Sequence, residues 1–130
     1  MFLIQIVLSD ALVRNLFICV FDAFLNETYS LCLSTEVLME YAEKFDNFLG
    51  EFVTYNLMET IISQDNISFH EIYFTFHLVK GYDDDNKFSD LYLSASADVL
   101  VTNDSRLLAL RNNSYPVINV VTLEEFMRNI

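Results

Sequence analysis

The chain has 130 residues, of which 53% are hydrophobic, and it contains only 2 Gly and 1 Pro. This length and composition predict a single compact domain over residues 1–130, and they exclude disordered, collagen-like and linker-rich architectures. Because 19 acidic residues outnumber 7 basic ones, the net charge is −12, which disfavours nucleic-acid binding through a generally basic surface.

The N-terminal part of the chain and its two cysteines predict a cellular compartment. Cys19 and Cys32 lie in apolar runs, which is typical of free core thiols in a reducing environment. The first residues lack the basic region and cleavage site of a signal peptide, and polar residues interrupt the most apolar stretch before it reaches a membrane-spanning length. We therefore expect a cytoplasmic protein without a membrane segment.

The first half of the chain alternates strand and helix patterns. Residues 2–8, FLIQIVL, have the near-continuous apolar pattern of a strand buried on both faces, and residues 29–34, YSLCLS, predict a second strand after a helix over 10–26. Ser34 is the expected N-cap of a helix that ends at Gly50. A further helix is expected over about residues 51–63.

The second half continues the alternation. Residues 70–79, HEIYFTFHLV, are rich in β-branched and aromatic residues and predict a strand. An acidic turn then leads into an amphipathic helix, with Asp85 as the expected N-cap. The remaining predicted elements are a strand at 99–101, a helical turn at 107–110, a strand at 117–121 and a terminal helix opened by a capping box of Thr122 and Glu125.

This order of elements favours an α/β fold, a three-layer α/β/α sandwich around a central, mainly parallel sheet of about five strands. In such sheets ligands bind outside the carboxyl ends of the strands. Asp10, Glu40, Asp85 and Asp104 all fall near that edge. Clustered carboxylates repel each other unless a cation neutralises them, and oxygen ligands favour Mg²⁺ or Mn²⁺. The four acids therefore make a candidate metal site.

Each acid also has a simpler structural explanation. Glu40 is four residues before Lys44 and suits an ion pair on one helix, and the aspartates suit a helix cap and a turn. Helical spacing places Glu40 at the border between the apolar stripe and solvent, whereas Glu36 and Glu43 point outward. Of these glutamates, only Glu40 is expected to reach a cleft beside the core.

Three segments carry a resemblance to a known family. Residues 83–110, DDDNKFSDLYLSASADVLVTNDSRLLAL, resemble the signature half of PIN-domain proteins that are toxin components of toxin–antitoxin pairs. Residues 34–41, STEVLMEY, and 117–127, VINVVTLEEFM, are similar to the family's acidic helix and to its closing strand and helix. The resemblance spans essentially the whole chain and implies a PIN-like fold.

The resemblance implies that Glu40, Asp85 and Asp104 are catalytic, metal-binding acids. The family's fourth acid, an aspartate at the end of the first strand, is replaced by Ser9, and Asp10 follows one residue later. A hydroxyl is a poorer Mg²⁺ ligand than a carboxylate, and a one-residue shift in a strand moves the side chain to the other face. Asp10 completes the catalytic set if the backbone turns after the strand, with Ser9 in a supporting role.

The resemblance also implies an activity and partners. The activity is that of an endoribonuclease in which one or two Mg²⁺ or Mn²⁺ ions activate water for attack on an RNA phosphodiester, and the protein partner is a cognate antitoxin that fills the site. Asp90, Thr102 and Asn103 are expected to support the site. Lys87 and Arg106 are candidate phosphate contacts, although a position at a solvated helix end explains them equally well.

Two functional classes stay open. The first is an active, metal-dependent ribonuclease toxin of a type II pair. The second is a degenerate PIN-like module that serves as a non-catalytic binding or regulatory protein, which the low basic count and Ser9 favour. A phosphate-receiving receiver domain is a distant third, because paired acids after the first strand are missing. A homodimer is also left open.

Overall fold

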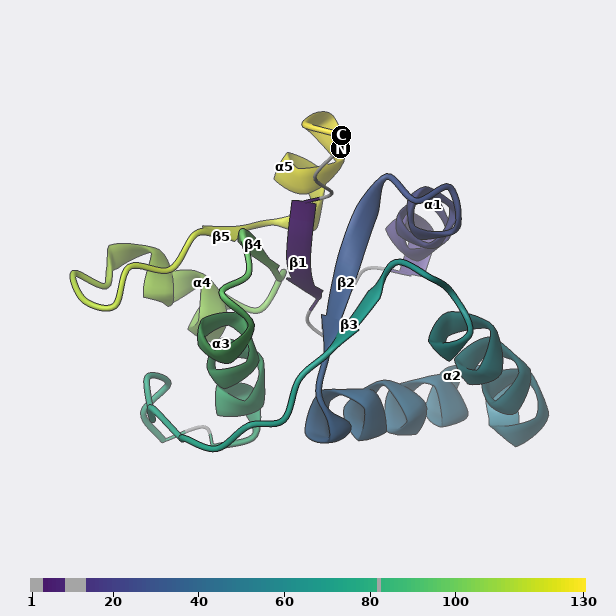
Figure 1. Ribbon diagram of the computed structural model, residues 1–130, viewed down its shortest axis with the longest axis horizontal. Helices are drawn as coiled ribbons and strands as arrows, with labels where there is room; N and C mark the ends of the chain where they lie inside the picture. The colour runs from purple at the N-terminus through teal and green to yellow at the C-terminus, as the bar shows by residue number, and fades with distance from the viewer. Residues whose placement is uncertain (1–3, 9–13, 82) are drawn as a thin grey trace.

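A five-stranded parallel sheet forms the centre of the fold (Figure 1). The computed structural model describes residues 4–8, 14–81 and 83–130. The sheet has the order β3-β2-β1-β4-β5, and each neighbouring pair is parallel. Its strands are β1 (Ile4–Leu8), β2 (Tyr29–Leu33), β3 (Ile67–Phe69), β4 (Val99–Val101) and β5 (Val120–Val121). The expected parallel sheet of about five strands is confirmed.

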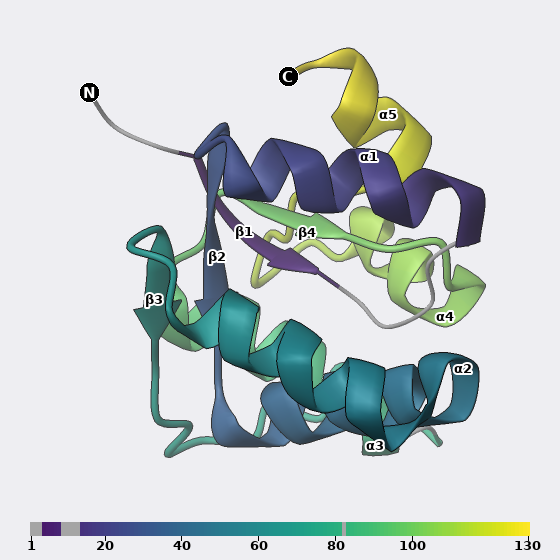
Figure 2. The same ribbon diagram turned by 90° about the vertical axis from the view of Figure 1, so that its right-hand side faces the viewer.

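Helices cover both faces of this sheet (Figure 2). One face carries the helices α1 and α5, and the other carries α2 and α3, so the predicted three-layer sandwich is also confirmed. No helix in the described ranges is both long and apolar enough to cross a membrane. The bounds are α1 (Arg14–Leu25), α2 (Thr35–Ile62), α3 (Asp83–Ala95), α4 (Ser105–Leu108) and α5 (Leu123–Arg128), with a 3₁₀ turn at Ala109–Asn112.

The long helix α2 joins two segments that the sequence predicts as separate helices. Ser34 is its N-cap, as expected, because its hydroxyl oxygen accepts a hydrogen bond from the Val37 N–H at 3.2 Å. Gly50 has φ 81° and ψ 164°, which are not helical values. The regular helix is therefore interrupted at Gly50, where the sequence predicted its end, and a second helical segment continues from this kink to Ile62 (Figures 1 and 2).

The strand predicted over residues 70–79 is wrong. The strand that pairs with β2 is β3, and its ladder ends where the N–H of His70 donates to the carbonyl of Leu33 at 2.8 Å. Beyond His70 the backbone leaves the sheet and is held by side chains of α3, so β-forming residue types are present without a neighbouring strand. The last strand is likewise shorter than predicted, because β5 covers only residues 120–121.

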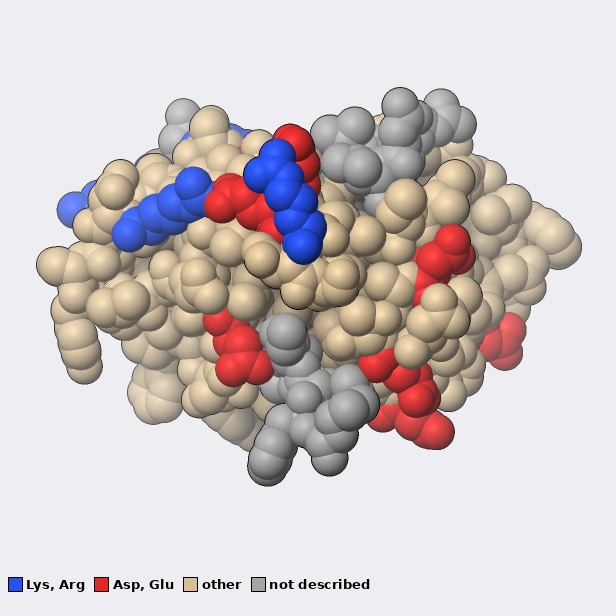
Figure 3. Space-filling model, turned by 90° about the horizontal axis from the view of Figure 1, so that it is seen from above, with Lys and Arg blue, Asp and Glu red and all other residues tan. Residues whose placement is uncertain are grey.

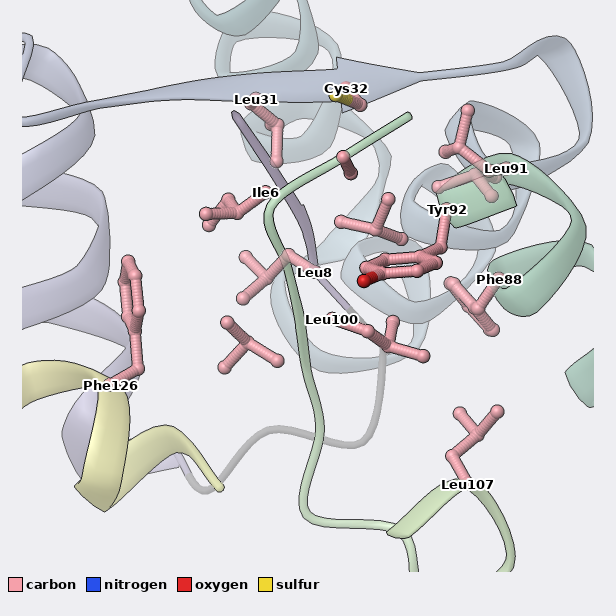
Figure 4. Close-up of a cluster of buried hydrophobic side chains, with 14 of the residues drawn as sticks. Ile6, Leu8, Leu31, Cys32, Phe88, Leu91, Tyr92, Leu100, Leu107 and Phe126 are labelled. Carbon is pink, nitrogen blue, oxygen red and sulfur yellow. The ribbon is translucent and has the colours of Figure 1, made fainter. Parts of the chain in front are cut away.

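The buried core occupies both faces of the sheet, and one part of it lies between the sheet and α3 (Figure 4). Val7 and Leu100 on adjacent strands, and Leu91 on α3, are fully buried. Burying one such side chain contributes about 1.5–3 kcal/mol. Tyr92 also packs in this region, where its hydroxyl accepts a hydrogen bond from the Asn119 N–H at 3.1 Å. These contacts fix α3 across β1 and β4, and thereby fix the position of the first turn of α3.

Candidate functional site

The loop after β4 leads directly into the first candidate acid. Strands β1 and β4 both run toward the side of the molecule on which α4 lies (Figure 2). Asp104 is the N-cap of α4, because its Oδ1 accepts the backbone N–H of Arg106 at 2.8 Å. The hydroxyl of Thr102 accepts the Asp104 N–H at 3.0 Å. Thr102 therefore orients Asp104, whereas the side chain of Asn103 binds the Leu123 N–H and braces the start of α5.

Arg106 connects this acid to a second one. Its guanidinium donates to both carboxylate oxygens of Asp104, with Nε to Oδ1 at 3.1 Å and Nη2 to Oδ2 at 2.8 Å. The same Nε lies 3.2 Å from Oδ2 of Asp85. The side chain of Arg106 thus bridges carboxylates from α3 and from the N-cap of α4.

Asp85 is the more buried end of this bridge. Helix α3 begins at Asp83, so the expectation that Asp85 is the N-cap is wrong, and Asp85 instead lies in the first turn. Its Oδ2 is buried and accepts a hydrogen bond from none of the residues that the structure describes, although Arg106 lies near it. Burial, followed by the nearby Asp104 carboxylate, raises the pKa of Asp85, and Arg106 opposes this shift.

The pKa of Asp104 is shifted in the opposite direction. The side-chain hydrogen bonds from Arg106 hold this pKa below its usual value, against the effect of burial. The pKa values of the two acids differ because burial dominates at Asp85, and because Arg106 donates two hydrogen bonds to Asp104 but makes only an ionic contact with Asp85. Asp85 is therefore the carboxylate of this pair that is less well neutralised.

Glu40 reaches the same region from α2. Its Oε1 accepts a hydrogen bond from Nζ of Lys87 at 2.7 Å, and its side chain is only 12% exposed. This ion pair joins α2 to α3. The Glu40 carboxylate is also one of the groups that raise the pKa of Asp85. Glu36 and Glu43 are exposed, as the helical spacing predicted.

Asp90 has a contact outside this group of acids. It is buried, and its Oδ1 accepts the backbone N–H of Phe76 at 2.9 Å. Mainly because of burial, its pKa is raised. Asp90 therefore holds the segment after β3 against α3. The predicted positions Ser9 and Asp10 lie outside the described residues.

Two contacts near the site were not predicted from the sequence. Asn86 is buried and binds both the N–H and the carbonyl of Val79, at 2.8 Å and 3.2 Å. The signal for Asn86 is its place in the D-N-K-F motif. The hydroxyl of Tyr41 donates to the carbonyl of Leu8, which ties α2 to the end of β1. The only sequence signal for this hydrogen bond is that Tyr41 is adjacent to the candidate acid Glu40.

The donor set and the geometry differ in what they imply for a metal ion. Carboxylate oxygens suit Mg²⁺ or Mn²⁺, and the buried Asp85 oxygen without a hydrogen bond is an available donor. Within the described ranges, however, no three or more His, Cys, Asp or Glu residues are grouped so that they could hold an ion. In this arrangement Glu40, Asp85 and Asp104 do not fit a metal, because Lys87 pairs with Glu40 and Arg106 pairs with the two aspartates.

Comparison with solved structures identifies the class of fold. One chain of a DNA-bound VapBC complex from Salmonella typhimurium superposes with a TM-score of 0.59 and 16% sequence identity, covering 92% of this chain and 98% of that chain. No protein-family model and no curated protein matches the sequence. At this identity the likeness concerns the fold, and the PIN-domain fold expected from the sequence is confirmed.

Proposed function

We propose that this chain is the toxin of a type II toxin–antitoxin pair and acts in the cytoplasm as a Mg²⁺- or Mn²⁺-dependent endoribonuclease on single-stranded or structured RNA. The observation that carries the proposal is the position of Asp85, whose buried oxygen lies beside Asp104 and whose pKa responds to both Asp104 and Glu40. A group of acids at the carboxyl edge of a parallel sheet is where the fold places ligand sites. The fold shared with a VapBC chain supports the same conclusion.

Each of the three acids is held in position by a different element. Thr102 and the first turn of α4 orient Asp104, the first turn of α3 carries Asp85, and α2 carries Glu40. Glu40, Asp85 and Asp104 are the acids that would hold a divalent cation, which would supply an activated water and charge neutralisation at the departing oxygen. Arg106 and Lys87 stand beside the acids as candidate phosphate contacts.

The proposed protein partner is an antitoxin. The structural neighbour comes from a VapBC complex, and the present chain has a net charge of −12. An acidic surface favours a partner that presents basic side chains, because complementary charge steers association and fixes orientation. We infer that such a partner covers the carboxyl edge of the sheet, where Glu40, Asp85 and Asp104 lie.

Cleavage of a mixed RNA pool, with and without Mn²⁺ or Mg²⁺, tests the proposed activity. Substitution of one acid, as in Asp85→Asn or Glu40→Gln, is expected to lower the rate at least about 100-fold, since even residues that only orient metal ligands change activity by about 10- to 100-fold. Glu43→Gln removes an exposed charge from the same helix as Glu40 and serves as the matched control. Cleavage that persists at the wild-type rate in EDTA, or in the acid variants, would contradict the proposal.

The second candidate is a non-catalytic PIN-like module. It is favoured by the ion pairs of Lys87 and Arg106, which already neutralise the described acids, and by Ser9 at the position of the family's first aspartate. This protein would bind an antitoxin without cleaving RNA. The same assay separates the two, because a wild-type chain that binds no Mn²⁺ and cleaves no RNA supports the second candidate.

A further inference from the structure

Three candidate metal-binding acids, Glu40, Asp85 and Asp104, are each in contact with a basic side chain of their own chain. Arg106 binds Asp104 through two side-chain hydrogen bonds and lies 3.2 Å from the buried oxygen of Asp85. Lys87 binds Glu40 at 2.7 Å. The chain has only 7 basic residues in all, so the presence of two of them at this edge is a marked local concentration of positive charge.

The position of the Arg106 guanidinium decides what else these carboxylates bind. A divalent cation shared by Asp85 and Asp104 needs the same oxygens that now face Nε and Nη2. Two positive groups repel each other at such short range, so the guanidinium and the ion exclude each other.

We propose that Arg106 is a built-in competitor of the divalent cation, whose guanidinium must leave Asp85 and Asp104 before the ion binds them. This inference rests on the metal dependence in the proposed function. Two features allow the exchange. The N-cap bond to Asp104 uses the backbone N–H of Arg106, so the side chain can leave without opening α4. The side chain is also 43% exposed, so it can turn into solvent.

The test measures Mn²⁺ binding by calorimetric titration of the full chain without RNA. Arg106→Gln removes the competing charge and is expected to bind Mn²⁺ about three- to tenfold more tightly than wild type, a modest factor because a partly exposed ion pair is screened by water. Arg106→Lys keeps the charge but loses the two-pronged geometry, and its affinity should lie between the two. Arg128→Gln is the control, because it removes the same charge from an exposed pair with Glu124.

A second readout follows the guanidinium itself. In a ¹H–¹⁵N spectrum of the arginine side chains, addition of Mg²⁺ should shift the Nε–H signal of Arg106 and leave that of Arg128 in place. An affinity in Arg106→Gln equal to or below that of wild type would overturn the inference while leaving metal dependence intact. If wild type, Arg106→Gln and Arg106→Lys all fail to bind Mn²⁺, the inference and the proposed metal dependence fail together.

Discussion

At the scale of single residues, the same chemical group takes on different properties according to its neighbours. Asp85 and Asp104 share one arginine, yet burial, followed by the Asp104 charge, raises the pKa of Asp85, whereas hydrogen bonds from that arginine lower the pKa of Asp104. The sequence predicted that Asp104 follows β4 and that Asp85 lies at the start of α3. It did not predict the ion pair between Glu40 and Lys87, because these residues are 47 positions apart.

The two cysteines are expected to differ in reactivity. Cys32 is buried on β2, and burial, with a smaller effect from Asp98, raises the pKa of its thiol to about 11. Cys19 is exposed on α1. Because the thiolate is the reactive form, a thiol reagent should label Cys19 rapidly in the native protein, and it should label both cysteines in denaturant. Mass spectrometry of the labelled peptides checks this, and rapid native labelling of Cys32 would contradict the burial described.

Asp90 is expected to set a pH dependence of stability. Its folded-state pKa is raised, so the folded chain binds the proton more tightly than the unfolded chain, and stability falls as the pH rises from the unfolded pKa through the folded one. Asp90→Asn keeps an oxygen for the Phe76 N–H and removes the buried charge. The gain of Asp90→Asn over wild type in urea unfolding should therefore be larger at about pH 7 than at about pH 4.

Asp90→Ala is the companion variant. It removes the buried charge, as Asp90→Asn does, but leaves the N–H of Phe76 without its acceptor. Its free energy of unfolding is therefore expected to be about 1–3 kcal/mol below that of Asp90→Asn at either pH. Equal stability of Asp90→Ala and Asp90→Asn would show that the hydrogen bond to Phe76 does not hold the segment after β3.

At the scale of elements, sequence patterns correctly predicted the features that depend on residues close together in the chain. The Ser34 cap and the Thr122–Glu125 capping box are short-range features, and both are present. The failure lies in residues 70–79, where strand-forming residues leave the sheet because Asp90 and Asn86, from a later helix, bind their backbone. Strand pairing depends on which distant segment is adjacent, and residue types alone do not specify that.

The bend in α2 depends on a glycine. Gly50 combines φ 81° with ψ 164°, a region that other residues rarely occupy, although a Cβ there would meet no atom within 4 Å. Gly50→Ala should therefore lower the free energy of unfolding by about 1–3 kcal/mol through backbone strain alone. Chemical denaturation measures this, with Glu51→Ala as an exposed control on the same helix. An unchanged or higher stability of Gly50→Ala would mean that α2 straightens without cost.

At the scale of the whole molecule, net charge and exposed apolar surface have opposite effects on self-association. Acidic and basic side chains meet in pairs near α5, whereas other acidic groups in the same view are surrounded largely by uncharged surface (Figure 3). The net charge of −12 makes the chain repel its own copies. The C-terminal half of α2 nevertheless exposes Phe52, Tyr55 and Ile62 at helical spacing. Exposed apolar faces of this kind mark surfaces that contact other molecules.

Self-association through this face should therefore depend on salt. Raising the NaCl concentration screens the repulsion between acidic copies, so the average mass measured by light scattering should increase with salt. Phe52 is 81% exposed, and Phe52→Asp places a charge in the middle of the apolar face, which should lower the mass at every salt concentration without changing the melting temperature. Ser94→Asp adds the same charge at an exposed position on α3 and separates the effect of net charge from that of the face. If both variants lower the mass equally, the apolar face of α2 is not the surface through which copies of the chain associate.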